Sequence, residues 1–289
     1  MIGKIQGARP RNRRRGGRRC ALPCVVPAVL ALLLPHAARA RPEDPWFTGR
    51  LRVAVGLDYR SGDYGSEFGA TKLLSVPVSV EYRFERLPFS PGDRLRLRVT
   101  VPYLRVDGPF RGEASETGGT GVDEGVGDVY LWLSYFYSPP WPKLPFAELG
   151  AGVKFPTADA DKNLGTGEFD YALALRLMDR FPIGDLVLTP FASVGYRFIG
   201  DPPGEKRNDT WRAGAGVSLR IDDGWALGAR YSVRESSIPG RTPRHEIGPF
   251  VNVRVNDRFS LVPYAVAGLS KWAPNWAVGF QLRWDTLVH

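Results

Sequence analysis

The sequence predicts an all-β protein, an antiparallel transmembrane β-barrel of about 12 strands preceded by a cleaved signal peptide. Three observations support this fold class. Apolar and polar residues alternate with a period of two in many segments, the connections alternate in length, and aromatic residues gather near segment ends. In such a barrel the apolar face of each strand meets lipid and the polar face meets the lumen. The alternative fold is a soluble periplasmic sandwich, which would bury the apolar face and leave the polar face in water.

The first forty residues have the three parts of a secretory signal peptide. Nine basic residues and no acidic residue lie there, an apolar run follows at residues 20–34, and Ala38-Arg39-Ala40 has the small-x-small pattern of a cleavage site. We therefore expect residues 1–40 to be a signal peptide and residues 41–289 to form one barrel. No later segment reaches 18 consecutive apolar residues, so we expect no transmembrane helix.

The net charge of +9 comes from this signal peptide. Removing its nine basic residues from the 39 leaves 30 Lys and Arg against 30 Asp and Glu, so the rest of the chain is formally neutral. The basic composition therefore does not indicate a nucleic-acid partner. Cys20 and Cys24 also lie in the signal peptide, so the exported part can form no disulfide. Closure of a barrel, in which every backbone group pairs, offers another source of stability.

Residues 146–177 show the strand pattern most clearly, as two strands joined by a polar loop. Apolar residues stand at positions 149, 151, 153 and 155 of the first arm and at the odd positions from 169 to 177 of the second. The same alternation predicts ten further strands. They lie near residues 51–59, 74–84, 95–103, 129–137, 186–199, 210–221, 225–234, 246–255, 259–270 and 275–284.

The connections after even-numbered strands are short, whereas those after odd-numbered strands are mostly longer, as at residues 107–125. Asp222-Asp223-Gly224 and Asn256-Asp257-Arg258 read as tight hairpin turns. An even strand number with short turns at one end and longer loops at the other is typical of outer-membrane barrels, and it predicts two periplasmic termini. Aromatic residues near the strand ends would then lie at the two membrane interfaces.

The last strand carries alternating apolar residues from Trp276 to Trp284. This pattern resembles the closing-strand signal that the barrel-assembly machinery reads, except that residues 285–289 follow Trp284. The expected partners are therefore this machinery during biogenesis, outer-membrane lipid and lipopolysaccharide, and a small-molecule solute.

Few residues offer catalytic or metal chemistry. His245 begins a strand near the outer rim, and Ser236 and Ser237 lie in the preceding loop, so a lipid-modifying hydrolase is one alternative function. No local motif joins these residues, and a rim histidine among polar neighbours is the simpler interpretation. Asp159 and Asp161 mimic the start of a calcium loop, but the glycine that such a loop needs is displaced. We expect no catalytic residue, metal or cofactor, and no enzyme activity.

Charged residues on the polar face of the strands form the candidate site. In a barrel they would line the lumen, where they either pair with one another or line water and select a solute. The sequence does not decide whether the lumen is a narrow polar path or is closed by paired charged side chains. The candidates are Arg52, Asp58, Glu81, Arg83, Arg96, Arg98, Asp128, Glu148, Lys154, Asp170, Arg176, Arg230 and Arg254, and Arg197, Arg220 and Glu246 share this face.

Three stretches resemble one known family. They are Gly125-Val126-Gly127-Asp128, residues 154–177 (KFPTADADKNLGTGEFDYALALRL) and residues 195–200 (GYRFIG). They are similar to outer-membrane proteins associated with the meta pathway of phenol degradation, in which a glycine often replaces Ala158. The resemblance implies an outer-membrane barrel that passes small solutes, aromatic or hydrophobic ones among them, and it supplies no catalytic residues.

We therefore expect a porin-like channel or transporter in the outer membrane of a Gram-negative bacterium. Besides the lipid-modifying hydrolase, a structural barrel with a closed lumen remains an alternative.

Overall fold

The computed structural model describes residues 49–64, 69–84, 92–108, 121–141, 144–162 and 164–288. The chain divides into two units, Met1–Arg41 and Pro42–His289, and every described residue belongs to the second. The predicted signal peptide lies outside the described residues. In the part of the chain that is described, no helix is both long and apolar enough to cross a membrane.

The described residues contain fourteen strand segments and one short 3-10 helix, joined by turns and loops. The helix is η2 (Ala160–Lys162). The strands are β1 (Gly49–Gly62), β2 (Thr71–Phe84), β3 (Arg94–Asp107), β4 (Val122–Val126), β5 (Val129–Tyr137), β6 (Phe146–Phe155), β7 (Asp170–Met178), β8 (Phe181–Ile183), β9 (Leu186–Ile199), β10 (Thr210–Arg220), β11 (Trp225–Arg234), β12 (Arg244–Arg254), β13 (Phe259–Gly268) and β14 (Trp276–Val288).

Two of the barrel strands are interrupted. Both β4 and β5 pair with β3, but their registers differ by one residue, so an extra residue at Gly127-Asp128 forms a β-bulge. Both β7 and β8 pair with β9 in one common register, across a break at Asp179 and Arg180. Counting each interrupted pair as one strand leaves twelve strands.

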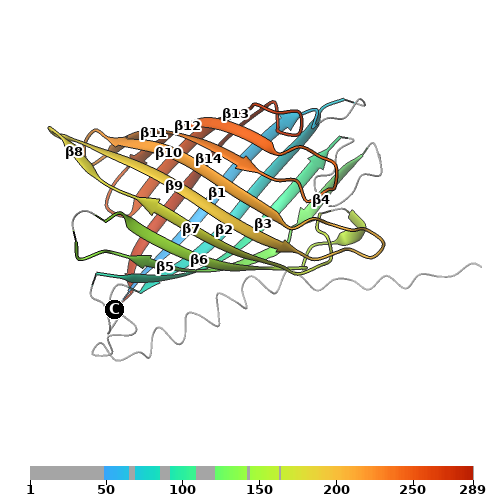
Figure 1. Ribbon diagram of the computed structural model, residues 1–289, viewed down its shortest axis with the longest axis horizontal. Helices are drawn as coiled ribbons and strands as arrows, with labels where there is room; N and C mark the ends of the chain where they lie inside the picture. Colours follow the sequence, from blue (N-terminus) through green and yellow to red (C-terminus); the bar gives the residue numbers. More distant parts are fainter. Residues whose placement is uncertain are drawn as a thin grey trace, which may run out of the picture. The chain divides into compact units, whose positions relative to one another are not determined.

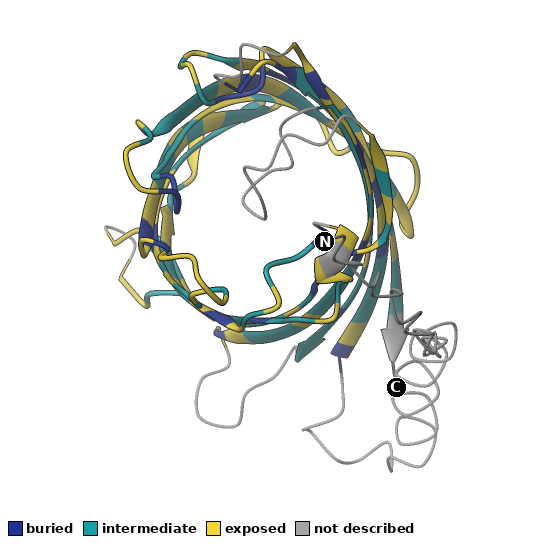
Figure 2. Cartoon of the chain, turned by 90° about the vertical axis from the view of Figure 1, so that its right-hand side faces the viewer, coloured by how far each residue is buried: buried dark blue, intermediate teal, exposed yellow. Residues whose placement is uncertain are grey.

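The twelve strands close into a ring. Each strand pairs antiparallel with the next one along the chain, and β14 pairs with β1 from Gly49↔Val288 to Ser61↔Trp276. Figure 1 shows the tilted strands from the side, and Figure 2 shows the closed ring from one end. We call the end with short connections the turn end and the opposite end, with the connections after β1, β3, β6, β9, β11 and β13, the loop end. The structure thus confirms the predicted 12-stranded antiparallel barrel.

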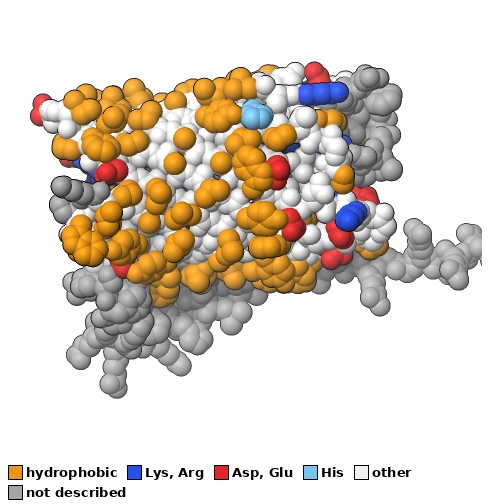
Figure 3. All heavy atoms as spheres, in the orientation of Figure 1, with side chains coloured by type: hydrophobic (Ala, Val, Ile, Leu, Met, Phe, Trp, Pro, Cys, Tyr) orange, Lys and Arg blue, Asp and Glu red, His pale blue; other side chains and the backbone are white. Residues whose placement is uncertain are grey.

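Apolar side chains cover the outer face of the barrel. Leu149 and Leu173 are each 56% exposed and Val194 is 51% exposed, although all three belong to the middle of strands. Figure 3 shows hydrophobic side chains spread along the outside of the strands. A water-soluble monomer rarely exposes an apolar surface of this extent, whereas lipid requires it. The apolar residues of the predicted alternation therefore point outward, and the polar residues between them point into the lumen.

Outward aromatic residues pair near both ends of the barrel. Tyr82 and Phe84 lie 4.7 Å apart at the turn end, measured between ring centroids. At the loop end, the Tyr59–Trp276 and Tyr196–Phe198 pairs have centroid distances of 5.5 and 4.9 Å. Amphipathic rings at these heights suit the two membrane interfaces.

Inward aromatic residues lie against glycines of a neighbouring strand. A Cβ atom on Gly152 would lie 2.1 Å from the Trp132 ring, and one on Gly228 would lie 2.2 Å from the Phe250 ring. Tyr264 covers Gly279 in the same way. Glycine weakens an isolated strand, but here it lets large rings lie along the wall.

Candidate functional site

The inner face of the barrel is rich in arginine. The predicted candidates occupy positions that alternate with the outward apolar residues, and several of them form ion pairs with inward residues on neighbouring strands. Among the described strand residues and the β4–β5 bulge, the basic side chains on this face include Arg52, Arg60, Arg83, Arg96, Arg98, Lys154, Arg176, Arg197, Arg212, Arg220, Arg230, Arg234, Arg244, Arg254 and Arg283. The acidic side chains are Asp58, Glu81, Asp123, Asp128, Glu148, Asp170, Glu246 and Asp285. Basic groups therefore outnumber acidic groups by about two to one.

Glu81 is the centre of a charge cluster at the turn end. Its side chain is 3% exposed and forms ion pairs with Arg83, at 2.5 Å between Nε and Oε1, and with Arg98. Arg52 forms a bidentate pair with Asp285 at 2.7 and 2.8 Å. These bonds tie β2 to β3 and β1 to β14 on the inner wall.

Two further arginines at this end contact no carboxylate in the described part of the chain. The Arg283 Nε donates to Gln281 at 2.7 Å, and Arg176 lies 4.7 Å from the centroid of the Phe191 ring. Because their positive charge is not cancelled by an ion pair, the turn-end lumen carries an excess of positive charge.

A second cluster lies at the loop end of β1, β12 and β13. Asp58 accepts a hydrogen bond from Arg60 at 2.6 Å and another from the Tyr264 hydroxyl at 2.5 Å. Arg60 also lies 3.6 Å from Glu246. Arg230 stands over the Tyr264 ring, 5.8 Å from its centroid. This cluster combines two carboxylates with two arginines and is close to neutral.

Tyr64 lies in the turn that follows β1. Burial raises the pKa of Tyr64, because the phenolate would lose its hydration. The ring is therefore neutral at ordinary pH, and the Arg244 guanidinium stands over it at 5.9 Å.

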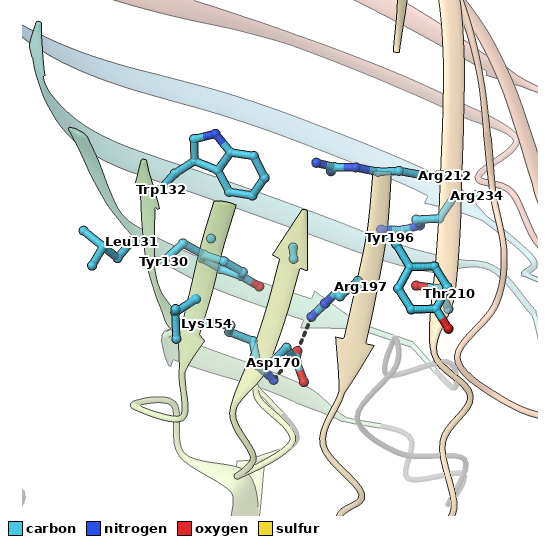
Figure 4. Close-up of a pocket in the computed structure, with 13 residues that line it drawn as sticks. Tyr130, Leu131, Trp132, Lys154, Asp170, Tyr196, Arg197, Thr210, Arg212 and Arg234 are labelled. Carbon is cyan, nitrogen blue, oxygen red and sulfur yellow. Dashed lines mark hydrogen bonds and ion pairs between the residues drawn. The ribbon is translucent and has the colours of Figure 1, made fainter. Parts of the chain in front are cut away.

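A third cluster surrounds a hollow in the lumen wall between β5 and β11. The hollow has a volume of about 190 Å³, and its lining includes Tyr130, Trp132, Arg197, Arg212 and Arg234 (Figure 4). It lies toward the loop end, since these residues come from the loop-end halves of their strands.

Lys154 is the buried centre of the ion network beside this hollow. Its Nζ atom lies 3.0 Å from Asp170 and 3.3 Å from Asp128, and it donates to the Thr166 hydroxyl at 2.6 Å. Arg197 shares the Asp170 carboxylate. Two carboxylates thus neutralise Lys154 and Arg197.

Arg212 and Trp132 face each other across the hollow, as Figure 4 shows. The guanidinium carbon of Arg212 lies 5.9 Å from the centroid of the Trp132 ring, which is within the range of a cation–π contact. In the described part of the chain, Arg212 has no carboxylate partner. The charged groups that act on it are Arg234 and Arg197, which repel it.

Several of these residues are absent from the sequence-based candidates. Arg212, Arg234, Arg283 and Trp132 are among them, although strand parity could have indicated them, because each follows or precedes an outward apolar residue. Asp285 was missed for another reason. The sequence pattern ends the last strand at Trp284, whereas β14 continues to Val288 and brings Asp285 opposite Arg52.

His245 lies on the outward parity of β12, and its ring contacts the Tyr231 hydroxyl at 2.5 Å from Nδ1. The Ser270 hydroxyl accepts a hydrogen bond from the backbone N–H of His245 at 3.0 Å, and Ser236 and Ser237 are buried. No described serine therefore lies within hydrogen-bond distance of the His245 ring. Within the described ranges, no three His, Cys, Asp or Glu residues are grouped so as to hold a metal ion.

A closed barrel of twelve antiparallel strands with an apolar exterior and a charged interior defines an outer-membrane β-barrel of the porin-like type. The chain belongs to the family described as "Putative MetA-pathway of phenol degradation", whose model matches residues 57–286.

Solved structures agree on the fold. The COG4313 outer membrane channel from Pseudomonas putida F1 is similar with a TM-score of 0.63 and 14% identity, over 86% of this chain and 100% of that one. The beta domain of the Bordetella autotransporter BrkA is similar with a TM-score of 0.50 and 14% identity, over 83% and 99% of the two chains. No curated protein matches the sequence.

Proposed function

We propose that the protein is an outer-membrane channel through which small solutes pass, and that its lumen favours anions. The observation that carries the proposal is the excess of basic over acidic side chains on the inner face. In a narrow, water-filled lumen such charges attract ions of opposite sign and repel ions of the same sign. A similar barrel of known structure is an outer membrane channel, which supports the channel part of the proposal.

The proposal includes the location and the solute class. The barrel would lie in the outer membrane with both termini in the periplasm, after export through the signal peptide and insertion by the barrel-assembly machinery. The family description refers to phenol degradation, which favours small aromatic or hydrophobic compounds among the solutes. Inward rings such as Trp132, Phe191 and Phe250 supply apolar contacts beside the charged groups.

Conductance in planar lipid bilayers tests this proposal. The full chain would be expressed, and the protein purified from outer membranes and inserted into the bilayer. We expect a steady conductance and, in a KCl gradient, a reversal potential that shows chloride to be more permeant than potassium. A barrel without conductance would instead support a structural barrel with a closed lumen.

Arg176 and Arg283 are suitable positions for the matched variants, because neither forms an ion pair with a described carboxylate. The double variant Arg176→Gln, Arg283→Gln should lower the preference for chloride by about twofold or more, since it removes two charges that form no ion pair. Arg254→Gln is the control, because Arg254 pairs with Asp257 at the turn end and is half exposed. Arg254 is also on the inner face, so an equal effect of Arg254→Gln would contradict selection by the inner charges that form no ion pair.

A further inference from the structure

The hollow between Trp132 and Arg212 has a floor of small residues. Antiparallel pairing puts Trp132, Gly152, Ala172 and Arg197 in one row across four strands. The adjacent row contains Gly150, Ala174, Gly195 and Arg212. In these two rows β6 and β7 therefore present only glycine or alanine to the lumen, and β9 presents Gly195 beside Arg197.

These small residues fix how the two large side chains lie. The Trp132 ring covers Gly150 and Gly152, where a Cβ atom would lie 2.5 and 2.1 Å from the ring. The Arg212 side chain passes over Gly195, where a Cβ atom would lie 3.1 Å from its Nε. An aromatic face and a guanidinium thus border the same open floor (Figure 4).

The charge of this hollow is not balanced. Asp170 and Asp128 are already engaged by Lys154 and Arg197, as described above. Arg212 has no carboxylate partner in the described part of the chain, and its charged neighbours Arg197 and Arg234 have the same sign. An anion placed here would be attracted by Arg212, whose charge no described carboxylate pairs.

We propose that this hollow is a binding site for an aromatic carboxylate on its way through the lumen, an inference that rests on the proposed channel function. The aromatic ring stacks on Trp132 above the glycine and alanine floor, and the carboxylate accepts two parallel hydrogen bonds from the Arg212 guanidinium. The volume of about 190 Å³ is adequate, since an engineered cavity of about 150 Å³ holds benzene.

Other occupants use only part of the site. A neutral aromatic compound leaves Arg212 without an acceptor, and a small inorganic anion makes no use of the Trp132 face. A ligand that has both an aromatic ring and a negative charge contacts both Trp132 and Arg212.

Isothermal titration of the purified protein in detergent with benzoate tests the proposal. Acetate, which lacks the ring, and benzyl alcohol, which lacks the charge, are the reference probes. We expect benzoate to bind about tenfold more tightly than either. Equal affinities for benzoate and acetate would overturn the proposal.

Two variants separate the contributions. Arg212→Gln should weaken benzoate binding about tenfold and leave benzyl alcohol unaffected, whereas Trp132→Leu should weaken benzoate and leave acetate unaffected. Arg230→Gln is the matched control, since Arg230 stands over the Tyr264 ring at 5.8 Å elsewhere on the inner wall. It removes the same charge and should leave benzoate binding unchanged. An equal loss in the control would show a general attraction by lumen charge and would overturn the site.

The same titration separates this inference from the channel proposal, because binding in detergent does not need conduction. Variant-sensitive benzoate binding without conductance would overturn the channel and retain the site. Conductance without preferential benzoate binding would overturn the site alone. Each variant is first compared with the parent protein for the gel mobility of the unheated barrel, so that misfolded protein is excluded.

Discussion

Lys154 holds the loop-end parts of β5, β6 and β7 together through buried charges. The Lys154 side chain is 3% exposed, and those of Asp128 and Asp170 are 6% and 2% exposed. Removing one member of a buried ion pair is costly, because the charge of the other member remains without compensation or hydration.

We expect Lys154→Met to lower the free energy of unfolding by about 3–5 kcal/mol, because it leaves two buried carboxylates with too few cations. Urea unfolding of the protein in lipid vesicles, followed by tryptophan fluorescence, measures the change. The double variant Lys154→Met, Asp170→Asn should recover part of the loss. Lys72→Met is the control, since Lys72 is exposed near the loop end of β2. Equal unfolding midpoints for Lys154→Met and Lys72→Met would contradict this role.

The sequence allowed only half of the lumen cluster to be predicted. Lys154 and Asp170 stand on the polar parity of two strands that are adjacent in the chain, so their proximity follows from a single hairpin. Trp132 and Arg212 belong to β5 and β10, and they meet only because three intervening strands have particular registers and small inward residues. Alternation within one strand carries no information about such registers.

At the scale of elements, two turns use the same side-chain cap. The Asp222 carboxylate accepts hydrogen bonds from the backbone of Gly224 and Trp225, both at 2.7 Å. In the turn from β12 to β13, Asn256 accepts from Arg258 and Phe259, both at 2.9 Å. Such turns fix the hairpin connection and so the register of the two strands.

We expect Asp222→Ala to lower the free energy of unfolding by about 1–2 kcal/mol, because two backbone N–H groups lose their acceptor. Urea unfolding in vesicles measures it, with Asp223→Ala as the neighbouring control that removes the same charge. Asp222→Asn should retain most of the stability, since an amide oxygen can accept the same bonds. If Asp223→Ala proved as destabilising as Asp222→Ala, charge rather than the cap would be responsible.

All twelve strands follow from the period-two pattern, but their interruptions do not. The bulge at Gly127-Asp128 shifts the outward parity from even positions in β4 to odd positions in β5. The sequence pattern instead assigned residues 122–125 of β4 to the long loop at residues 107–125. The predicted turn after β7 contains β8, because Phe181–Ile183 is too short for alternation to be recognised. A short segment such as β8 forms a strand because it pairs with the longer strand β9, so its own sequence does not predict it.

At the scale of the whole molecule, the arrangement of charge matters more than its total. The chain from Arg41 onward is formally neutral, yet its inner wall carries about two basic groups for each acidic one. In the described part of the chain, many acidic residues lie instead in loops and turns, away from the inner wall. A count over the sequence conceals this separation, which depends on where the closed barrel puts each residue.

The salt dependence of ion selectivity tests whether this separation controls permeation. Fixed charges act over about 10 Å at 0.1 M salt and about 3 Å at 1 M salt. We therefore expect the chloride-to-potassium permeability ratio, measured from reversal potentials in bilayers, to be clearly higher near 0.1 M KCl than near 1 M. The Arg176→Gln, Arg283→Gln variant should show a smaller difference between the two conditions. A ratio independent of salt in the parent protein would mean that pore size, and not the arginine-rich wall, decides which ions pass.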